Sequence, residues 1–135
     1  MIGIELFSGA GGMSLGAKMA GIEVHLGIEI DKFAAQTYKI NHPDSLIIND
    51  DIRNVKEIPK TMVAHKGKIL FGGPPCQGFS RSNHRTRNKT NPNNWLFEEF
   101  VRISQLWKPD WVVLENVQGI LGTESGMFIE EIFKS

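Results

Sequence analysis

Short apolar runs that alternate with amphipathic stretches constrain the fold of this chain more than any other feature of its sequence. Five apolar runs have the length and composition of buried strands, and the stretches between them carry apolar residues at helical spacing. Strands that alternate with helices favour an α/β fold with a doubly wound, mostly parallel sheet. The five expected strands are residues 2–7, 24–30, 45–48, 68–71 and 111–114.

The helices between these strands have recognisable ends. Gly21 is placed to end a helix over residues 13–20, and Asp31 is a suitable N-cap for a helix that stops before Pro43. Asn93 or Asn94 is expected to cap a helix that continues to Trp107. A last helix is expected over residues 127–133.

Polar or glycine-rich residues follow every expected strand. In doubly wound sheets, ligands bind beyond the carboxyl ends of the strands. We therefore expect one site at that edge of the sheet. Its candidate groups, in strand order, are the glycines of residues 9–12, Glu29, Asp51, Cys76 and Glu115.

Length and composition indicate a single soluble domain over residues 1–135. No apolar run approaches the roughly 20 residues that span a bilayer, and the N-terminus lacks the basic region of a signal peptide. A single cysteine excludes an internal disulfide and suits a reducing compartment. The four histidines lack metal-ligand spacing, so no metal site is expected. We expect a cytoplasmic protein.

The charge is balanced overall but unevenly distributed. The chain has 15 Lys+Arg and 15 Asp+Glu, yet residues 58–97 contain seven basic residues and no acidic one. The remaining residues therefore sum to a net charge of −7 (8 − 15). Such asymmetry favours a polyanionic partner such as nucleic acid, although a solvated basic loop would give the same pattern.

The glycine-rich turn at residues 7–12 would let backbone amides at a helix N-terminus approach a ligand. Glu29 follows about 20 residues later, at the end of the next strand, where an acid commonly holds a ribose hydroxyl pair. Asp51 would then be free to accept a hydrogen bond from an adenine amino group. The alternative is that Glu29 and Asp31 only cap the following helix. No lysine follows the glycines, so the turn is not a P-loop.

Cys76 follows two glycines and two prolines, which would hold its backbone rigidly. Arg81 and Arg85 lie close in sequence and would favour a thiolate, whereas a buried, inert cysteine is the alternative. Glu115 would lie in the same cleft, where partial desolvation could keep its carboxyl protonated. A thiolate beside an acid suggests nucleophilic attack on an electron-poor ring, followed by group transfer.

Five motifs in this order resemble the DNA cytosine-5 methyltransferase family over nearly the whole chain. They are Phe-Ser-Gly-Ala-Gly-Gly at residues 7–12, Glu29, Asp51-Ile52, Gly-Pro-Pro-Cys-Gln-Gly-Phe-Ser at residues 73–80, and Glu-Asn-Val at residues 115–117. The Pro-Cys-Gln and Glu-Asn-Val pair is the most specific of them. Glu5 stands where family members more often have Asp.

The resemblance implies S-adenosylmethionine as the cofactor, bound over the first three strand ends. Glu29 would hold the ribose, Asp51 the adenine amino group and Ile30 the adenine face, while Pro75 and Leu96 would line the methionine side. The full set of implied cofactor residues is Phe7, Gly9, Ala10, Gly12, Glu29, Ile30, Asp51, Ile52, Pro75 and Leu96.

The resemblance also implies a catalytic pair and a DNA-binding segment. Cys76 would attack C6 of a cytosine flipped out of double-stranded DNA, and Glu115 would act at N3, so that C5 becomes nucleophilic and takes the methyl group. The enzyme would be of the bacterial restriction-modification type, associated with the nucleoid through its DNA. The implied substrate and DNA residues are Gln77, Ser80, Arg81, Ser82, Arg85, Asn116 and Val117.

The family carries further elements that this sequence does not contain: an Arg-x-Arg element, a target-recognition region and a C-terminal helix. We therefore expect a sheet truncated after about five strands, in a fragment or one subunit of a split enzyme. A complementary subunit or a homodimer through the truncated edge would cover that edge. Alone, the chain is expected to show weak or no cofactor binding and no methyl transfer. Two alternatives are a non-catalytic remnant that binds cofactor or a partner, and a transfer-RNA methyltransferase of the same family.

Overall fold

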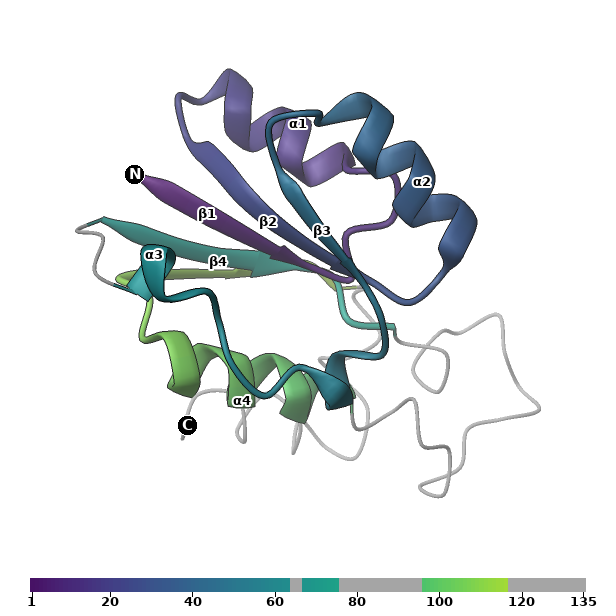
Figure 1. The fold of residues 1–135 in the computed structure, drawn as a ribbon. Coiled ribbons are helices and arrows are strands. Elements are labelled where there is room, and N and C mark those ends of the chain that lie inside the picture. The colour runs from purple at the N-terminus through teal and green to yellow at the C-terminus, as the bar shows by residue number, and fades with distance from the viewer. Residues whose placement is uncertain (64–66, 76–95, 117–135) are drawn as a thin grey trace.

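The chain forms a parallel five-stranded sheet with helices on both faces, as seen in a computed structural model (Figure 1). The structure describes residues 1–63, 67–75 and 96–116. The strand order is β3-β2-β1-β4-β5. From β1 at the centre, the chain adds β2 and β3 on one side and then crosses back to add β4 and β5 on the other. This is the order of a doubly wound sheet, and it confirms the fold class predicted from the sequence. The strands are β1 (Ile2–Leu6), β2 (Glu23–Glu29), β3 (Leu46–Asn49), β4 (Lys68–Gly72) and β5 (Trp111–Leu114).

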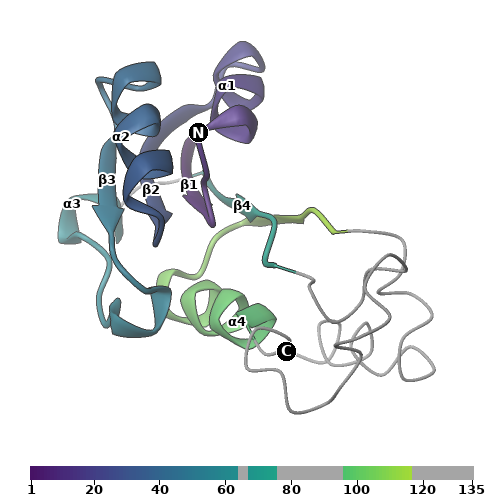
Figure 2. The ribbon, with the colours of Figure 1, turned by 90° about the vertical axis from the view of Figure 1, so that its right-hand side faces the viewer.

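Helices cover the two faces of the sheet unequally. Two helices lie on one face of the sheet. One long helix and two separate short helical segments lie on the other face (Figures 1 and 2). The first pair is α1 (Gly12–Met19) and α2 (Lys32–Asn41); the second group is η1 (Ile52–Asn54), α3 (Lys60–Val63) and α4 (Leu96–Trp107). None of the described helices is long and apolar enough to cross a membrane.

Each expected strand has a counterpart, and the N-cap expected at Asp31 is confirmed. The Asp31 carboxylate accepts a hydrogen bond from the Ala34 amide at 2.7 Å. The sequence reading missed η1 and α3, which are too short to carry a helical period. The cap expected at Asn93 or Asn94 and the helix expected over residues 127–133 lie outside the described residues.

The core lies between the centre of the sheet and α4. All five residues of β1 are buried, as fits a strand with neighbours on both sides and helices on both faces. Four residues of α4 recur at three- and four-residue spacing and are buried against this face: Phe97, Phe100, Ile103 and Trp107. The Trp107 indole donates a hydrogen bond to the Met62 carbonyl at 3.0 Å, which attaches α3 to α4.

Glu5 is an acidic residue inside this buried central strand. Its side chain is only 2% exposed, and it accepts hydrogen bonds from the Ser14 amide at 3.1 Å and from the Ser14 hydroxyl. The Ser14 hydroxyl also pairs with the Tyr38 hydroxyl at 3.0 Å, so the network joins β1 to α1 and α2. Burial disfavours the carboxylate more than these hydrogen bonds favour it, and it raises the pKa of Glu5 from 4.5 to about 7.

This pKa predicts a loss of stability as the pH rises. The unfolded chain gives up the Glu5 proton near pH 4.5, whereas the folded chain holds it until about pH 7. The free energy of unfolding should therefore fall between these two pH values, by about 3 kcal/mol from this group. In Glu5→Gln the fall should be absent, as measured by urea denaturation across this pH range. The exposed Glu23→Gln is the matched control and should keep the wild-type slope; the same slope in Glu5→Gln would contradict the assignment.

Candidate functional site

A cavity of about 360 Å³ lies at the carboxyl ends of the strands, at the edge predicted from the sequence. Its walls come from the last two residues of β2, from the residues that follow β1, β2, β3 and β4, and from the first residue of α4. The described lining residues are Phe7, Ile28, Glu29, Ile30, Asp50, Asp51, Ile52, Arg53, Gly73, Pro75 and Leu96.

Seven of the ten residues predicted to hold a cofactor line this cavity: Phe7, Glu29, Ile30, Asp51, Ile52, Pro75 and Leu96. Gly9, Ala10 and Gly12 belong to the adjoining turn and are not among its described lining residues. The sequence reading missed four others: Ile28, Asp50, Arg53 and Gly73. Each of the four lies one or two residues from a predicted one, so proximity along the chain was the available signal.

Glu29 connects the end of β2 to the glycine-rich turn. One of its carboxylate oxygens accepts a hydrogen bond from the Gly9 amide at 2.8 Å, and the other accepts one from the Asp31 amide at 2.8 Å. These two bonds fix the direction of the carboxylate at the cavity wall. The N-cap of α2 is Asp31 alone. The alternative in which Glu29 only caps the next helix therefore does not describe its contacts.

The last residue and the C-cap of α2 hold the glycine-rich turn through hydrogen bonds. The His42 imidazole donates from Nε2 to the Gly11 carbonyl at 2.9 Å, and the Asn41 amide donates to the Ala10 carbonyl at 2.9 Å. Gly11 has φ 90°, and a Cβ there would lie 2.2 Å from His42 Nε2. In contrast, a Cβ on Gly9 or Gly12 would meet nothing within 4 Å. The turn is thus tightly packed at Gly11 and leaves open space beside Gly9 and Gly12.

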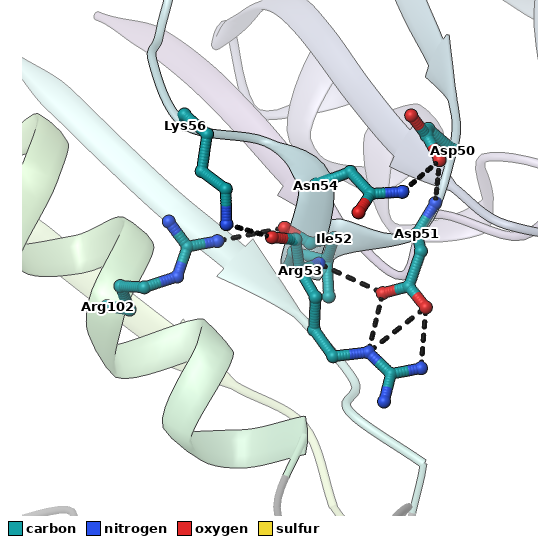
Figure 3. A network of polar contacts seen from close by, with 7 residues as sticks. All are labelled: Asp50, Asp51, Ile52, Arg53, Asn54, Lys56 and Arg102. Atoms are coloured by element: carbon teal, nitrogen blue, oxygen red, sulfur yellow. Dashed lines mark hydrogen bonds and ion pairs between the residues drawn. The ribbon is translucent and has the colours of Figure 1, made fainter.

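Asp51 is held by its neighbour Arg53 (Figure 3). One Asp51 oxygen accepts from the Arg53 amide and from Arg53 Nε, both at 2.9 Å, and the other accepts from Nη2 at 2.5 Å. These hydrogen bonds, with the guanidinium charge, hold the pKa of Asp51 below its usual value. Asp51 therefore presents a fixed carboxylate to the cavity over a wide pH range.

Glu115 lies beside Gly73 at the end of β5. The Glu115 amide donates to the Gly72 carbonyl at 2.9 Å, and a Cβ on Gly73 would lie 2.6 Å from the Glu115 carboxylate. The glycine thus leaves room for the acid next to a lining residue of the cavity. The Glu115 side chain is exposed, so the described residues do not provide the desolvation expected for it.

The expected nucleophile and most of the expected DNA contacts lie outside the described residues. Pro75 lines the cavity, and Cys76 is the next residue in the chain. Asn116 is described, is half-buried and does not line the cavity. The other predicted residues outside the described ranges are Gln77, Ser80, Arg81, Ser82, Arg85 and Val117.

A comparison of the sequence with protein families shows which family the chain belongs to. The model of the C-5 cytosine-specific DNA methylase family matches residues 1–135. The chain belongs to this family. The resemblance noted in the sequence is therefore confirmed.

Relatives in the methylase family share both sequence and fold with the chain. The Type II methyltransferase M.DdeI of Desulfomicrobium norvegicum is 41% identical over 131 residues, which are 96% of this chain and 31% of the relative. A candidate DNA modification methyltransferase from an Escherichia coli prophage superposes with a TM-score of 0.81 at 34% identity, over 99% of this chain and 37% of that one. A DNMT2 mutant from Spodoptera frugiperda superposes with a TM-score of 0.70 at 28% identity, over 98% and 40%.

The chain therefore spans about a third of the length of the curated methylases that it matches, for which the covered shares are 31%, 36% and 36%. The shared third contains the cavity and its three acidic residues, Glu29, Asp50 and Asp51. The other two thirds of those relatives have no counterpart in this chain.

The packing of the glycine-rich turn predicts different costs for two alanine substitutions. Gly9→Ala keeps a positive φ in open space, and it should lower the free energy of unfolding by about 1 kcal/mol. Gly11→Ala adds a collision with His42 and Tyr38, and it should cost about 3 kcal/mol or more. Urea denaturation of both variants measures the difference. Equal costs would contradict the packing described for Gly11.

Proposed function

We propose that this chain is the cofactor-binding and catalytic part of a DNA cytosine-5 methyltransferase of the bacterial restriction-modification type. The observation that carries the proposal is one cavity walled by two fixed carboxylates, Glu29 and Asp51, next to the Pro-Pro-Cys and Glu-Asn-Val motifs. Family membership supports the reaction type. The names of the curated relatives, which are Type II methyltransferases, support the restriction-modification setting.

The chemistry of the cavity fits S-adenosylmethionine. Each Glu29 oxygen uses one lone pair on a backbone amide and keeps another for a ribose hydroxyl. Asp51 offers a carboxylate to the adenine amino group, and apolar side chains of Ile30, Ile52 and Leu96 offer surfaces for the ring and the methionine chain. When bound, this cofactor supplies an electrophilic methyl group. Ala10 and Gly12 would support it with the amides of the adjoining turn, and Gly9 would hold Glu29 in place through its own amide.

Cys76 and Glu115 would carry the chemistry on the base. The Cys76 thiolate forms a bond to C6 of a flipped-out cytosine, while Glu115 gives a proton or hydrogen bond at N3, so that electron density moves to C5. C5 then takes the methyl group, and S-adenosylhomocysteine remains as the second product. C5 gives its proton to solvent, N3 returns a transferred proton to Glu115, and the bond between sulfur and C6 breaks, which restores the thiolate. A base must leave the helical stack for this attack, because its ring faces are covered within the duplex.

Double-stranded DNA is the proposed substrate, and residues 58–97 supply the charge to bind it. This stretch has seven basic residues and no acidic one. Cationic and hydroxyl side chains contact phosphates without reading sequence. The proposed DNA and substrate contacts are Gln77, Ser80, Arg81, Ser82, Arg85, Asn116 and Val117. A DNA substrate implies action in the cytoplasm, at the nucleoid.

The outer strand β5 supports the proposal that a further polypeptide completes the enzyme. Three of its four residues are apolar and exposed: Trp111 (64%), Val112 (50%) and Val113 (46%). An apolar strand at a sheet edge is a template for pairing with another chain. A complementary subunit, or failing that a second copy of this chain, would cover it.

Cofactor binding is tested with S-adenosylhomocysteine and saturation-transfer NMR on the purified chain. Because both carboxylates are already in place, we expect weak binding with saturation of the adenine and ribose protons. Glu29→Gln should abolish the signal, since an amide cannot accept from both backbone amides and both hydroxyls. Glu23→Gln, at the opposite end of the same strand, is the matched control and should bind like wild type. No signal from the wild type, or equal signals from wild type and Glu29→Gln, would refute the cofactor assignment.

The nucleophile is tested with a duplex that contains 5-fluorocytosine, in which the proton lost from C5 is replaced by fluorine. The chain, combined with a polypeptide that supplies the C-terminal part of a relative, should form a covalent adduct that survives denaturing electrophoresis. Cys76→Ser should give none, and an unmodified duplex should leave no stable adduct. Retention of the adduct by Cys76→Ser would show that the nucleophile lies elsewhere. A fluorinated transfer RNA in place of the duplex distinguishes the RNA-modifying alternative.

A further inference from the structure

The segment that follows β3 is held in shape by its own side chains (Figure 3). One Asp50 carboxylate oxygen accepts from the Asp51 amide at 2.7 Å and from the Asn54 side chain at 2.8 Å. The Lys56 ammonium donates to the Arg53 carbonyl at 2.5 Å. Together with the pairing of Arg53 and Asp51, these bonds make residues 50–56 a preformed unit. This unit carries Asp51 and Ile52 to the cavity wall.

Arg102 attaches this preformed unit to α4. Its Nη2 donates to the Ile52 carbonyl at 2.8 Å, and its Nη1 donates to the Val55 carbonyl at 2.9 Å. Its Nε donates to Glu99 at 2.7 Å, one turn earlier on the same helix. The planar guanidinium thus bridges two carbonyls of the 3₁₀ turn while a carboxylate on its own helix fixes its plane. Figure 3 shows Arg102 reaching from α4 toward this turn.

The same helix supplies another part of the cavity wall. Leu96, its first residue, lines the cavity, as do Asp51 and Ile52 from the preformed unit. Arg102 therefore connects two parts of the cavity wall, α4 and the preformed unit. Its partner Ile52 lies 50 residues earlier in the chain. Glu99 of α4 also interacts electrostatically with Arg53 in the preformed unit.

We propose that Arg102 is a positioning residue for the cofactor: by holding residues 51–55 against α4, it directs the Asp51 carboxylate at the adenine amino group. The inference rests on the proposed function, in which Asp51 reads adenine. If residues 51–55 shifted, the Asp51 carboxylate would no longer face the adenine amino group. The site would then lose its preference for adenine over a base that lacks this group. Arg102 itself would not touch the cofactor.

The packing of α4 distinguishes this role from a purely structural one. Phe97, Phe100, Ile103 and Trp107 bury the helix against the sheet without help from Arg102. The Arg102 side chain is 34% exposed, so water can replace its donors at the two carbonyls. Loss of the guanidinium should therefore leave the helix docked and alter chiefly the direction of residues 51–55.

The test compares two ligands, S-adenosylhomocysteine and its inosine analogue, in which a carbonyl oxygen replaces the adenine amino group. Affinities are measured by ligand-observed NMR titration of the complete chain. The wild type should prefer the adenine compound by roughly tenfold or more, because the analogue sets an acceptor against Asp51. Arg102→Met, which keeps an unbranched apolar chain in place of the arginine methylenes but loses every donor, should reduce the preference severalfold, and Arg102→Lys should give an intermediate value. Lys108→Met is the matched control and should keep the wild-type preference, since Lys108 is an exposed cation just beyond α4 and outside residues 50–56.

Two results would overturn the inference. One is an Arg102→Met variant that keeps the wild-type preference. The other is a variant that loses both ligands by the same factor together with a lower midpoint of thermal unfolding, which indicates a general structural role. Failure of the wild type to bind either ligand is a separate outcome: it overturns the proposed cofactor and this inference with it. Because the preference is a ratio, a modest change in overall stability does not alter it.

Discussion

Parallel pairing of β1 with β2 on one side and β4 on the other is the constraint on which the rest of the structure depends. The register matches Leu6 to Ile28 and to Gly72, so the three strands end at one level. The residues that follow them are then neighbours, although more than 60 positions separate Phe7 from Gly73 in the chain. The cavity forms at that level because the strands run in the same direction and stop together.

Backbone amides fix the direction of the Glu29 carboxylate, and the Arg53 guanidinium fixes Asp51 and keeps it charged, whereas burial favours the protonated form of Glu5. Glu29 accepts two backbone amides, and Asp51 accepts several donors from Arg53 at an exposed edge. Glu5 has hydrogen bonds as well, but it lies in the sheet centre, where desolvation dominates and its pKa rises to about 7. An acidic side chain is thus a fixed anion at the sheet edge, in Asp51. In the core, in Glu5, it is a group that loses its proton only near pH 7. Its surroundings decide which.

The sequence predicted those parts of the fold and the site that depend on local pattern. The five strands, the Asp31 cap and the 20-residue offset from Gly9 to Glu29 all follow from short-range periodicity and from the position of a polar residue at a strand end. Leu96 was predicted from the family resemblance, and the structure places it at the cavity. What escaped prediction is non-local. Arg102 is an ordinary polar residue on the outer side of an amphipathic helix, and its carbonyl partners lie 47 and 50 residues earlier. Glu5 carried a signal, a charge within an apolar strand, but its partner Ser14 is visible only once α1 is folded back onto β1.

The division of the cavity between distant segments has a consequence for how the protein reaches its native state. Strands β1, β2 and β3 with α1 and α2 are contiguous in the first 49 residues, and their pairings are short in sequence. The wall formed by α4 requires closure of a loop of about 50 residues, which is slow relative to local pairing. The glycine-rich turn and Glu29 can therefore form before the wall supplied by α4 exists. A ligand that touches both walls would stabilise the docked helix by mass action, so the last step of folding and the first step of binding draw on the same contact.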